Sequence, residues 1–269
     1  MGRGMFDFSG KTVLVVGGTS GINRGVAESF ATRGARVAVA SRSQDKVSDT
    51  VRAMELLGVE SAGFAADVRD AAAIECGVAG IHDRFGALDV VVSGAAGNFP
   101  ALAKDLSANG FKAVMDIDLL GTFHVMKAIL PYLRKPGASV INISAPQAFI
   151  PMQAQIHVCA AKAGVDMVTR TLALEWGREG VRVNSVVPGP IDGTEGMARL
   201  APTESLREQV AQSVPLGRFG TPADIGNACL FLASDLAAFI NGAVIPVDGG
   251  WAQNSCGGMS DYLGSLTRQ

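Results

Sequence analysis

Seven short runs of β-branched and apolar residues recur along the 269-residue chain, and longer helical segments separate most of them. The runs that we predict as strands span residues 12–16, 36–40, 61–65, 88–92, 140–143, 182–187 and 243–247. Strands that alternate with helices of roughly 10 to 20 residues are typical of a parallel sheet covered on both faces. The pattern therefore predicts an α/β fold with a seven-stranded, doubly wound sheet. No linker-like stretch or internal repeat interrupts it, so we expect residues 1–269 to form one domain.

A glycine-rich turn follows the first predicted strand directly and leads into a predicted helix at residues 26–33. Glycines permit a tight turn, and the amino terminus of a helix presents unpaired amide donors and a partial positive charge to a pyrophosphate. The G-x-x-x-G spacing differs from the common G-x-G-x-x-G, so the strand–turn–helix context gives the motif its weight. We therefore predict a Rossmann-type dinucleotide site with these residues on the phosphate side: Gly17, Thr19, Ser20, Gly21 and Ile22.

The second and third predicted strands end in side chains suited to the other half of a dinucleotide. Ser41 and Arg42 follow the second strand, and no acid stands there to bind a ribose 2′-hydroxyl. The planar fork of donors on Arg42 can pair with a 2′-phosphate, which favours NADP over NAD; a solvated surface arginine is the alternative. Asp67 and Val68 follow the third strand. Asp67 is placed to accept from an adenine amino group, or else it caps the next helix.

Composition and charge argue against several other classes of partner and location. A formal net charge of -2 provides no basic field for nucleic acid. No apolar run approaches the roughly 18 residues of a spanning helix, and the amino-terminal MGRGMFDFSGK lacks the apolar core of a signal peptide. Scattered cysteines without a C-x-x-C pair, and histidines without ligand spacing, predict neither disulfides nor a metal site. The final Leu-Thr-Arg-Gln differs from a peroxisomal Ser-Lys-Leu signal, so we expect a cytoplasmic protein without membrane contact.

Further short strings lie near the ends of the later strands: Ala95-Ala96-Gly97, Ile141-Asn142-Ile143-Ser144, Val183-Asn184, Pro188-Gly189 and Asp248-Gly249-Gly250. Together with the glycine-rich turn, they resemble the short-chain dehydrogenase/reductase family over about residues 9–251. The resemblance implies a nicotinamide cofactor and a homotetramer. It also implies these additional cofactor contacts: Ala95, Ala96, Gly97, Lys162, Pro188, Gly189, Ile191 and Thr194.

The chain departs from this family at the usual catalytic residues, which are a helix asparagine, a serine, and a tyrosine four residues before a lysine. Its two tyrosines, Tyr132 and Tyr262, have no lysine four residues later. When Lys162 is matched to the family lysine, Val158 stands at the tyrosine position and Ala145 at the serine position. The usual proton donor of the family is therefore missing.

An aspartate, Asp118, stands at the position of the helix asparagine, and Asn23 replaces a glycine of the turn. The same departures are shared with the peroxisomal-type 2,4-dienoyl-CoA reductases, which the chain also resembles at residues 95–99, 114–118, 173–177 and 188–196. In that branch an aspartate and a lysine are implicated in catalysis, and the matching residues here are Asp118 and Lys162. The resemblance implies reduction of a conjugated enoyl thioester within fatty acid β-oxidation.

The spacing of apolar residues over 109–128 agrees with a special role for Asp118. One face of the predicted helix there carries Phe111, Val114, Met115, Leu119 and Thr122. Asp118 lies on that face, whereas Asp116 turns toward Lys112 on the polar side. A buried carboxylate costs several kcal/mol unless it is paired, hydrogen-bonded or protonated, and burial raises its pKa. Asp118 is therefore a candidate acid; a buried acid satisfied by backbone amides is the alternative.

Lys162 lies among the small residues of Cys159-Ala160-Ala161-Lys162-Ala163-Gly164, which allow another helix to approach closely. The resemblance implies that this lysine reaches the cofactor ribose; otherwise it extends from a packed face to solvent. His157, one residue before the missing tyrosine, is an alternative proton donor. We expect Asn98, Phe99 and Ser144 on the substrate side.

These expectations lead to one main hypothesis on function and two alternatives. The main hypothesis is NADPH-dependent reduction of 2,4-dienoyl-CoA to 3-enoyl-CoA, with Asp118 supplying a proton or orienting a water. The alternatives are a carbonyl or alcohol oxidoreductase with a relocated acid, and a noncatalytic NADP-binding sensor. We expect an irregular insertion at 188–202, and a substrate lid over residues 188–212.

Overall fold

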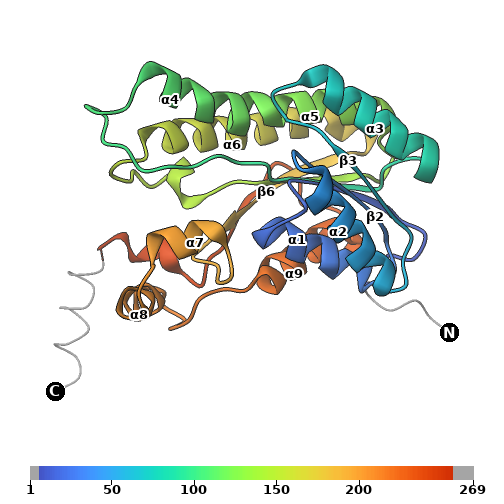
Figure 1. The fold of residues 1–269 in the computed structure, drawn as a ribbon. Coiled ribbons are helices and arrows are strands. Elements are labelled where there is room, and N and C mark those ends of the chain that lie inside the picture. The colour runs from blue at the N-terminus through green and yellow to red at the C-terminus, as the bar shows by residue number, and fades with distance from the viewer. Residues whose placement is uncertain (1–5, 257–269) are drawn as a thin grey trace.

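The computed structural model of the protein describes residues 6–256 and contains a seven-stranded sheet (Figure 1). Its strands are β1 (Thr12–Val16), β2 (Arg36–Ser41), β3 (Ser61–Ala65), β4 (Val90–Ser93), β5 (Ser139–Ile143), β6 (Arg182–Pro188) and β7 (Val244–Val247). Every neighbouring pair is parallel, in the order β3-β2-β1-β4-β5-β6-β7. The predicted doubly wound α/β fold is therefore confirmed.

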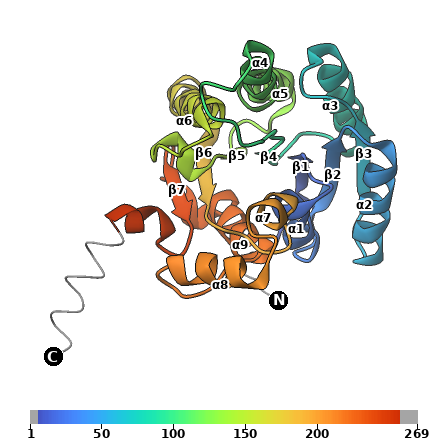
Figure 2. The same cartoon turned by 60° about the vertical axis from the view of Figure 1, so that its left-hand side comes forward.

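Helices cover both faces of this sheet (Figure 2). They are α1 (Gly21–Ala31), α2 (Gln44–Leu56), α3 (Ala71–Phe85), α4 (Ala108–Val114), α5 (Gly121–Ile129), α6 (Ile156–Trp176), α7 (Glu195–Leu200), α8 (Glu204–Ser213) and α9 (Pro222–Ala233). Helices α1, α2 and α9 share one apolar cluster with the sheet, and α3, α5 and α6 share another. The sheet is thus buried on both faces, which explains why its strands are apolar at almost every position.

The first strand shows how the two clusters arise from one run of residues. All five residues of β1 are buried. Val13 and Val15 belong to the cluster with α1, whereas Leu14 and Val16 belong to the cluster with α3. Successive side chains of a strand point to opposite faces, so an uninterrupted apolar run supplies both cores.

A close contact between α1 and α9 fixes the position of the helix that follows the glycine-rich turn. A Cβ atom added to Gly25 would lie 2.2 Å from the Cβ atom of Pro222 in the first turn of α9. Only a residue without a side chain permits that approach. Gly25 therefore serves the packing of α1, while the glycines before it form the turn.

Some boundaries and one helix differ from the predicted ones. Strand β4 begins at Val90, and Leu88 contributes only an isolated bridge to Leu133. The helix predicted over 109–128 consists of α4, a π-helix at Met115–Leu120, and α5. At its end, the Gly121 N–H bonds to the Asp116 carbonyl, so the turn is one residue wider than an α-helical turn. Apolar periodicity did not indicate this wider turn.

The irregular insertion predicted at 188–202 is wrong in part, because α7 lies within it and α8 follows directly. Both helices begin at a threonine whose hydroxyl accepts a backbone N–H: Thr194 from Met197, and Thr203 from Leu206. Such caps satisfy amide donors that a helix leaves unpaired at its amino terminus. The abundance of Gly and Pro in this segment concealed these two start signals.

Within residues 6–256, no helix has the length and apolar character to cross a membrane, and no group of three or more His, Cys, Asp and Glu side chains could hold a metal ion. Cys76, Cys159 and Cys229 are free thiols. Burial raises the pKa of the Cys229 thiol to about 12. The side chain of Cys256 and the carboxyl-terminal tetrapeptide lie outside what the structure describes.

Candidate active site

The strand order reverses between β1 and β4, and the glycine-rich turn lies where these two strands end. Open α/β sheets bind ligands in the crevice at such a switch point. Gly17 has a φ of +79°, and an added Cβ atom would lie 3.0 Å from the Ala95 amide nitrogen. The turn after β1 and the residues after β4 therefore lie against each other at the switch point, where folds of this kind bind ligands in a crevice.

The amino terminus of α1 opens into this crevice. The helix begins at Gly21, and the preceding Ser20 makes no side-chain cap bond. Its first amide groups therefore stay available for an anion. An added Cβ atom at Gly21 would lie 3.5 Å from the Thr194 methyl group, so the segment after β6 forms a further side of the crevice.

Asn23, which replaces a glycine of the family pattern, connects two parts of the crevice. Its side-chain amide donates to the Gly94 carbonyl at 2.8 Å, and the residue is 8% exposed. This bond ties the first turn of α1 to the residue that follows β4. The substitution thus has a structural use that the sequence pattern alone did not reveal.

After the ends of β2 and β3, Arg42 is exposed and Asp67 is bound by Arg69. Two side-chain nitrogens of Arg69 donate to the Asp67 carboxylate at 3.0 and 2.7 Å. This pairing, together with the nearby charge of Arg42, holds the pKa of Asp67 at about 2. Asp67 does not cap α3, because Asp70 occupies that cap. Val68 is buried, and its carbonyl contacts the His124 ring at 2.8 Å.

Asp118 lies in the π-helix and is 1% exposed. Its Oδ1 accepts the Gly97 N–H at 2.7 Å, and its Oδ2 lies 3.6 Å from Lys162 Nζ. Oδ2 has no hydrogen-bond partner among the described residues. Burial raises the pKa of Asp118, while the Lys162 charge and the Gly97 amide oppose that rise. One carboxylate oxygen is thus hydrogen-bonded to a backbone amide, and the other is available for a hydrogen bond to a ligand or water.

Lys162 is held inside the molecule and does not extend to solvent. It lies on α6, the residue is 6% exposed, and Nζ donates to the Ile143 carbonyl at 3.0 Å. Because Ile143 ends β5, the ammonium group sits at the same edge of the sheet as the crevice. A chain of contacts therefore runs from Gly97 through Asp118 to Lys162 and β5.

The residues expected on the substrate side occupy different environments. Asn98 is exposed, and Phe99 is 39% exposed with its ring centroid 4.7 Å from that of His157. Ser144 is buried, and its hydroxyl lowers the pKa of Asp166, a carboxylate on α6 that is 3% exposed. The structure therefore brings Phe99 and His157 together, and the Ser144 hydroxyl influences the pKa of Asp166.

Asp166 is a buried acid of this region that we did not identify from the sequence. It follows Lys162 by one helical turn, and that spacing was the available signal. Burial raises its pKa, although the hydroxyl groups of Ser144 and Ser185 lower it. A raised pKa means that the ionised carboxylate opposes folding above the unfolded-state value of 3.8.

We therefore expect Asp166→Asn to increase the free energy of unfolding at neutral pH. The gain should be absent below pH 3.8, grow as the pH rises through the raised pKa, and then stay constant. Thermal melts between pH 3 and 8 measure it, with the exposed Asp45→Asn as a control that stays within about 0.5 kcal/mol of the wild type. A lower melting temperature at pH 7 would show that the charged form is stabilising.

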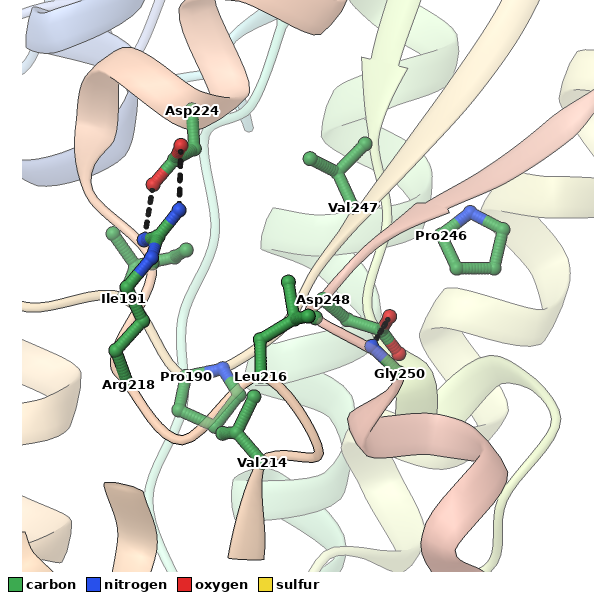
Figure 3. A pocket seen from close by; sticks show the side chains of 12 residues that line it. Pro190, Ile191, Val214, Leu216, Arg218, Asp224, Pro246, Val247, Asp248 and Gly250 are labelled. Atoms are coloured by element: carbon green, nitrogen blue, oxygen red, sulfur yellow. Dashed lines mark hydrogen bonds and ion pairs between the residues drawn. The ribbon is translucent and has the colours of Figure 1, made fainter. Parts of the chain in front are cut away.

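A pocket of about 510 Å³ lies beside the ends of β6 and β7 (Figure 3). Pro190 and Ile191 line one side, Val247 and Asp248 another, and the Arg218–Asp224 ion pair lies at its edge, with 2.9 Å between the charged atoms. It shares Ile191 with the expected cofactor contacts but includes neither Asp118 nor Lys162. The buried Asp118–Lys162 pair therefore lies outside this pocket.

Comparison with known proteins places these features in a larger group. The family model described as enoyl-(acyl carrier protein) reductase matches residues 16–252. The chain is 42% identical to a peroxisomal 2,4-dienoyl-CoA reductase, (3E)-enoyl-CoA-producing, of Arabidopsis thaliana, over 90% of this chain and 84% of that protein. It is 41% identical to the protein of the same name in Pongo abelii, over 94% and 88% of the two chains.

A bacterial relative and two solved structures extend the comparison. A Bacillus subtilis protein named as a probable 2,4-dienoyl-CoA reductase, (2E)-enoyl-CoA-producing, is 38% identical over 89% of this chain and 96% of its own. A short chain dehydrogenase from Bacillus anthracis has a TM-score of 0.81 and 39% identity, covering 90% and 96% of the two chains. A variant actinorhodin polyketide ketoreductase with NADPH has a TM-score of 0.86 and 29% identity, covering 90% and 97%.

The expected cytoplasmic location is contradicted by these comparisons. The relatives from Arabidopsis thaliana and Pongo abelii are both named as peroxisomal proteins. The expectation rested on composition and on the lack of known signals. Composition and charge reflect solubility and general binding, and they do not identify a compartment.

Proposed function

Since the chain belongs to the short-chain dehydrogenase/reductase family and is an oxidoreductase, we propose that it reduces 2,4-dienoyl-CoA to 3-enoyl-CoA with NADPH. The observation that carries the proposal is the buried Asp118, whose Oδ2 faces Lys162 at 3.6 Å and has no hydrogen-bond partner among residues 6–256. The names of the plant and Pongo abelii relatives support the same substrate and product.

The crevice at the switch point fits a nicotinamide dinucleotide. Its glycines leave no space for side chains, and the amides at the start of α1 are available to phosphate oxygens. We propose the following cofactor contacts: Gly17, Thr19, Ser20, Gly21, Ile22, Ser41, Arg42, Asp67, Val68, Ala95, Ala96, Gly97, Lys162, Pro188, Gly189, Ile191 and Thr194. When bound, the reduced nicotinamide supplies two electrons and one hydrogen to the far end of the conjugated diene.

In this proposal, Lys162 and Asp118 determine where the negative charge is stabilised and where the proton is added. Direct reduction of a carbonyl needs a proton donor at its oxygen, whereas a reduced dienoyl thioester spreads the negative charge over an oxygen and the α-carbon. The positive charge of Lys162 stabilises that developing charge. Asp118, which burial favours in its protonated form, supplies the α-carbon proton directly or through a water. Protonation at the α-carbon leaves the remaining double bond at position 3.

An assay of NADPH oxidation tests the proposed function. Purified protein should oxidise NADPH with 2,4-decadienoyl-CoA and leave a panel of ketones unreduced, and the product double bond should lie at position 3 by NMR. Activity only with ketones would indicate a carbonyl reductase, and tight cofactor binding without any turnover would indicate a sensor. A product with its double bond at position 2 would contradict the proposed 3-enoyl product and would match the (2E)-enoyl-CoA product in the name of the Bacillus subtilis relative.

The preference for NADPH depends on Arg42 in this proposal. We expect Arg42→Ala to weaken NADPH binding by about 10- to 100-fold, because a charge-assisted bond to the 2′-phosphate contributes about 1.5–3 kcal/mol. Binding of NADH, which lacks that phosphate, should change little. Fluorescence titrations measure both constants, with the exposed Arg52→Ala on α2 as a matched control. Equal losses for both cofactors would assign Arg42 a general structural role.

We further propose that residues 188–212 form a substrate lid and that the enzyme is a homotetramer. The lid segment contacts the cofactor side of the molecule through Glu195, which lies 3.8 Å from Lys46 of α2. Exposed apolar side chains on the outer helices support association between copies of the chain, among them Phe123 on α5, and Met167 and Leu174 on α6.

A further inference from the structure

His157 combines complete burial with two free ring nitrogens. It is the second residue of α6, directly before the position of the missing tyrosine, and it is 0% exposed. Neither Nδ1 nor Nε2 has a hydrogen-bond partner among the described residues. Buried polar groups are ordinarily paired, and unpaired ones call for an explanation. Packing alone would be served equally well by an apolar ring.

The surroundings of His157 connect it to the reacting centre. The Phe99 ring lies on one side, with centroids 4.7 Å apart and planes inclined by 56°. Two residues before Phe99, the Gly97 N–H donates to Asp118 Oδ1 at 2.7 Å, so the segment 97–99 contacts both Asp118 and His157. A positive charge on His157 would lower the pKa of Asp118. Asp118 Oδ2 and both imidazole nitrogens are thus buried and without hydrogen-bond partners among the described residues, and they belong to two elements, the π-helix and α6, that pack against each other.

Three other charged groups on α6 and on the elements packed against it are engaged with other partners. The π-helix and α4, which pack against α6, also carry Asp116 and Lys112. These two form an ion pair with each other at the surface. Lys162, five residues further along α6, is bonded to the Ile143 carbonyl and faces Asp118. Asp118 is a buried carboxylate in this region with an oxygen that no described residue hydrogen-bonds, and we assign the proton exchange with His157 to it.

We propose that His157 is a proton relay that acts through Asp118 and returns a proton to it after each turnover; this inference rests on the proposed function. The O–H bond of Asp118 breaks, and its proton forms the new C–H bond at the α-carbon of the reduced thioester. The carboxylate takes a proton from the imidazolium N–H of His157. The neutral imidazole then takes a proton from solvent when Phe99, which is 39% exposed, moves aside.

The test compares His157→Phe with His82→Phe in the full-length protein. His82 is a matched control, because its ring lies 4.8 Å from the Tyr132 ring and its Nδ1 is buried without a partner. Tyr132 precedes β5, so this pair is at the opposite edge of the sheet from the active site. We expect His157→Phe to reduce kcat by about 100-fold with KM unchanged, and to increase the solvent deuterium isotope effect. His82→Phe should match the wild type in each measurement.

A spectroscopic measurement on the same proteins is independent of turnover. The chain has three histidines, so labelling the imidazole Cε1 with ¹³C gives three signals, and each Phe variant assigns one. Addition of NADP and the unreactive decanoyl-CoA should shift the His157 signal and its titration with pH, and leave His82 unchanged. If His157→Phe does not fold, His157→Gln replaces it, and added imidazole should restore activity to His157→Ala.

The outcomes separate this inference from the proposed function. A wild type that does not consume NADPH with 2,4-dienoyl-CoA contradicts the proposed function. A wild type that is active, with a His157→Phe variant that keeps its kcat and isotope effect, overturns the relay alone. A His157 signal that neither titrates nor shifts in the complex also overturns the relay, because a relay must change its protonation.

Discussion

Asp118→Asn is expected to lower kcat for 2,4-dienoyl-CoA reduction by about 10²–10⁴-fold, the range typical of a lost general acid. Asparagine has the same shape and keeps an oxygen to accept the Gly97 N–H, which Asp118 accepts at 2.7 Å. It cannot give up a proton as a carboxylic acid does. NADPH affinity should therefore persist while the chemical step slows, as stopped-flow and equilibrium titrations would show.

Asp116→Asn is the matched control for this experiment. Asp116 lies two residues earlier in the same π-helix, but its carboxylate pairs with Lys112 at the surface. Exposed ion pairs contribute little to stability, so this variant should retain wild-type kinetics. Full activity in Asp118→Asn would remove Asp118 from the mechanism, and equal losses in both variants would indicate a general disturbance of the π-helix.

Lys162→Met is expected to lower kcat/KM by about 10²–10³-fold, because it removes a fixed positive charge from the place where negative charge develops. The change also removes the bond to the Ile143 carbonyl and the charge 3.6 Å from Asp118 Oδ2. The lysine lowers the pKa of Asp118, so its loss should raise that pKa further. If the protonated Asp118 is the active form, the fall in activity at high pH should move to higher pH.

Lys127→Met, on the exposed side of α5, provides the control for Lys162→Met. It removes the same charge from the protein as a whole and should leave both kcat/KM and the pH profile as in the wild type. The residual activity of Lys162→Met, measured from pH 5 to 9, shows how far the fall in activity at high pH has moved. A profile that moves to lower pH would mean that Lys162 does not stabilise the ionised form of Asp118.

The sheet and the position of the glycine-rich turn could be predicted from the sequence because local signals specify them. Each strand is a short apolar run followed by turn residues, and parallel strands buried on both faces need such runs. The sequence predicted a glycine-rich turn directly after the first strand, and the structure has this turn after β1, in contact with Ala95. The threonines that begin α7 and α8 are local signals too, but the many Gly and Pro residues around them led us to predict an irregular insertion instead.

The candidate site was only partly predictable. Helical spacing placed Asp118 on a buried face, and the structure buries it to 1% exposure. The spacing gave no indication of the π-helix, which packs against α6 and ends at the bond from the Gly121 N–H to the Asp116 carbonyl. The place of Ser144 beside the substrate stays a prediction, whereas its effect on the pKa of Asp166 could be found only from the packed structure.

The sequence by itself determined the α/β architecture, the glycine-rich turn after β1 and the absence of the usual tyrosine. These depend on the order and spacing of residues within single elements, which periodicity records directly. The tertiary structure decided which polar groups meet: Gly97 with Asp118, Asp118 with Lys162, and Phe99 with His157. In each pair the two residues come from different segments of the chain. Their pKa values and reactivity depend on burial and on nearby charges, and these exist only once the segments pack together.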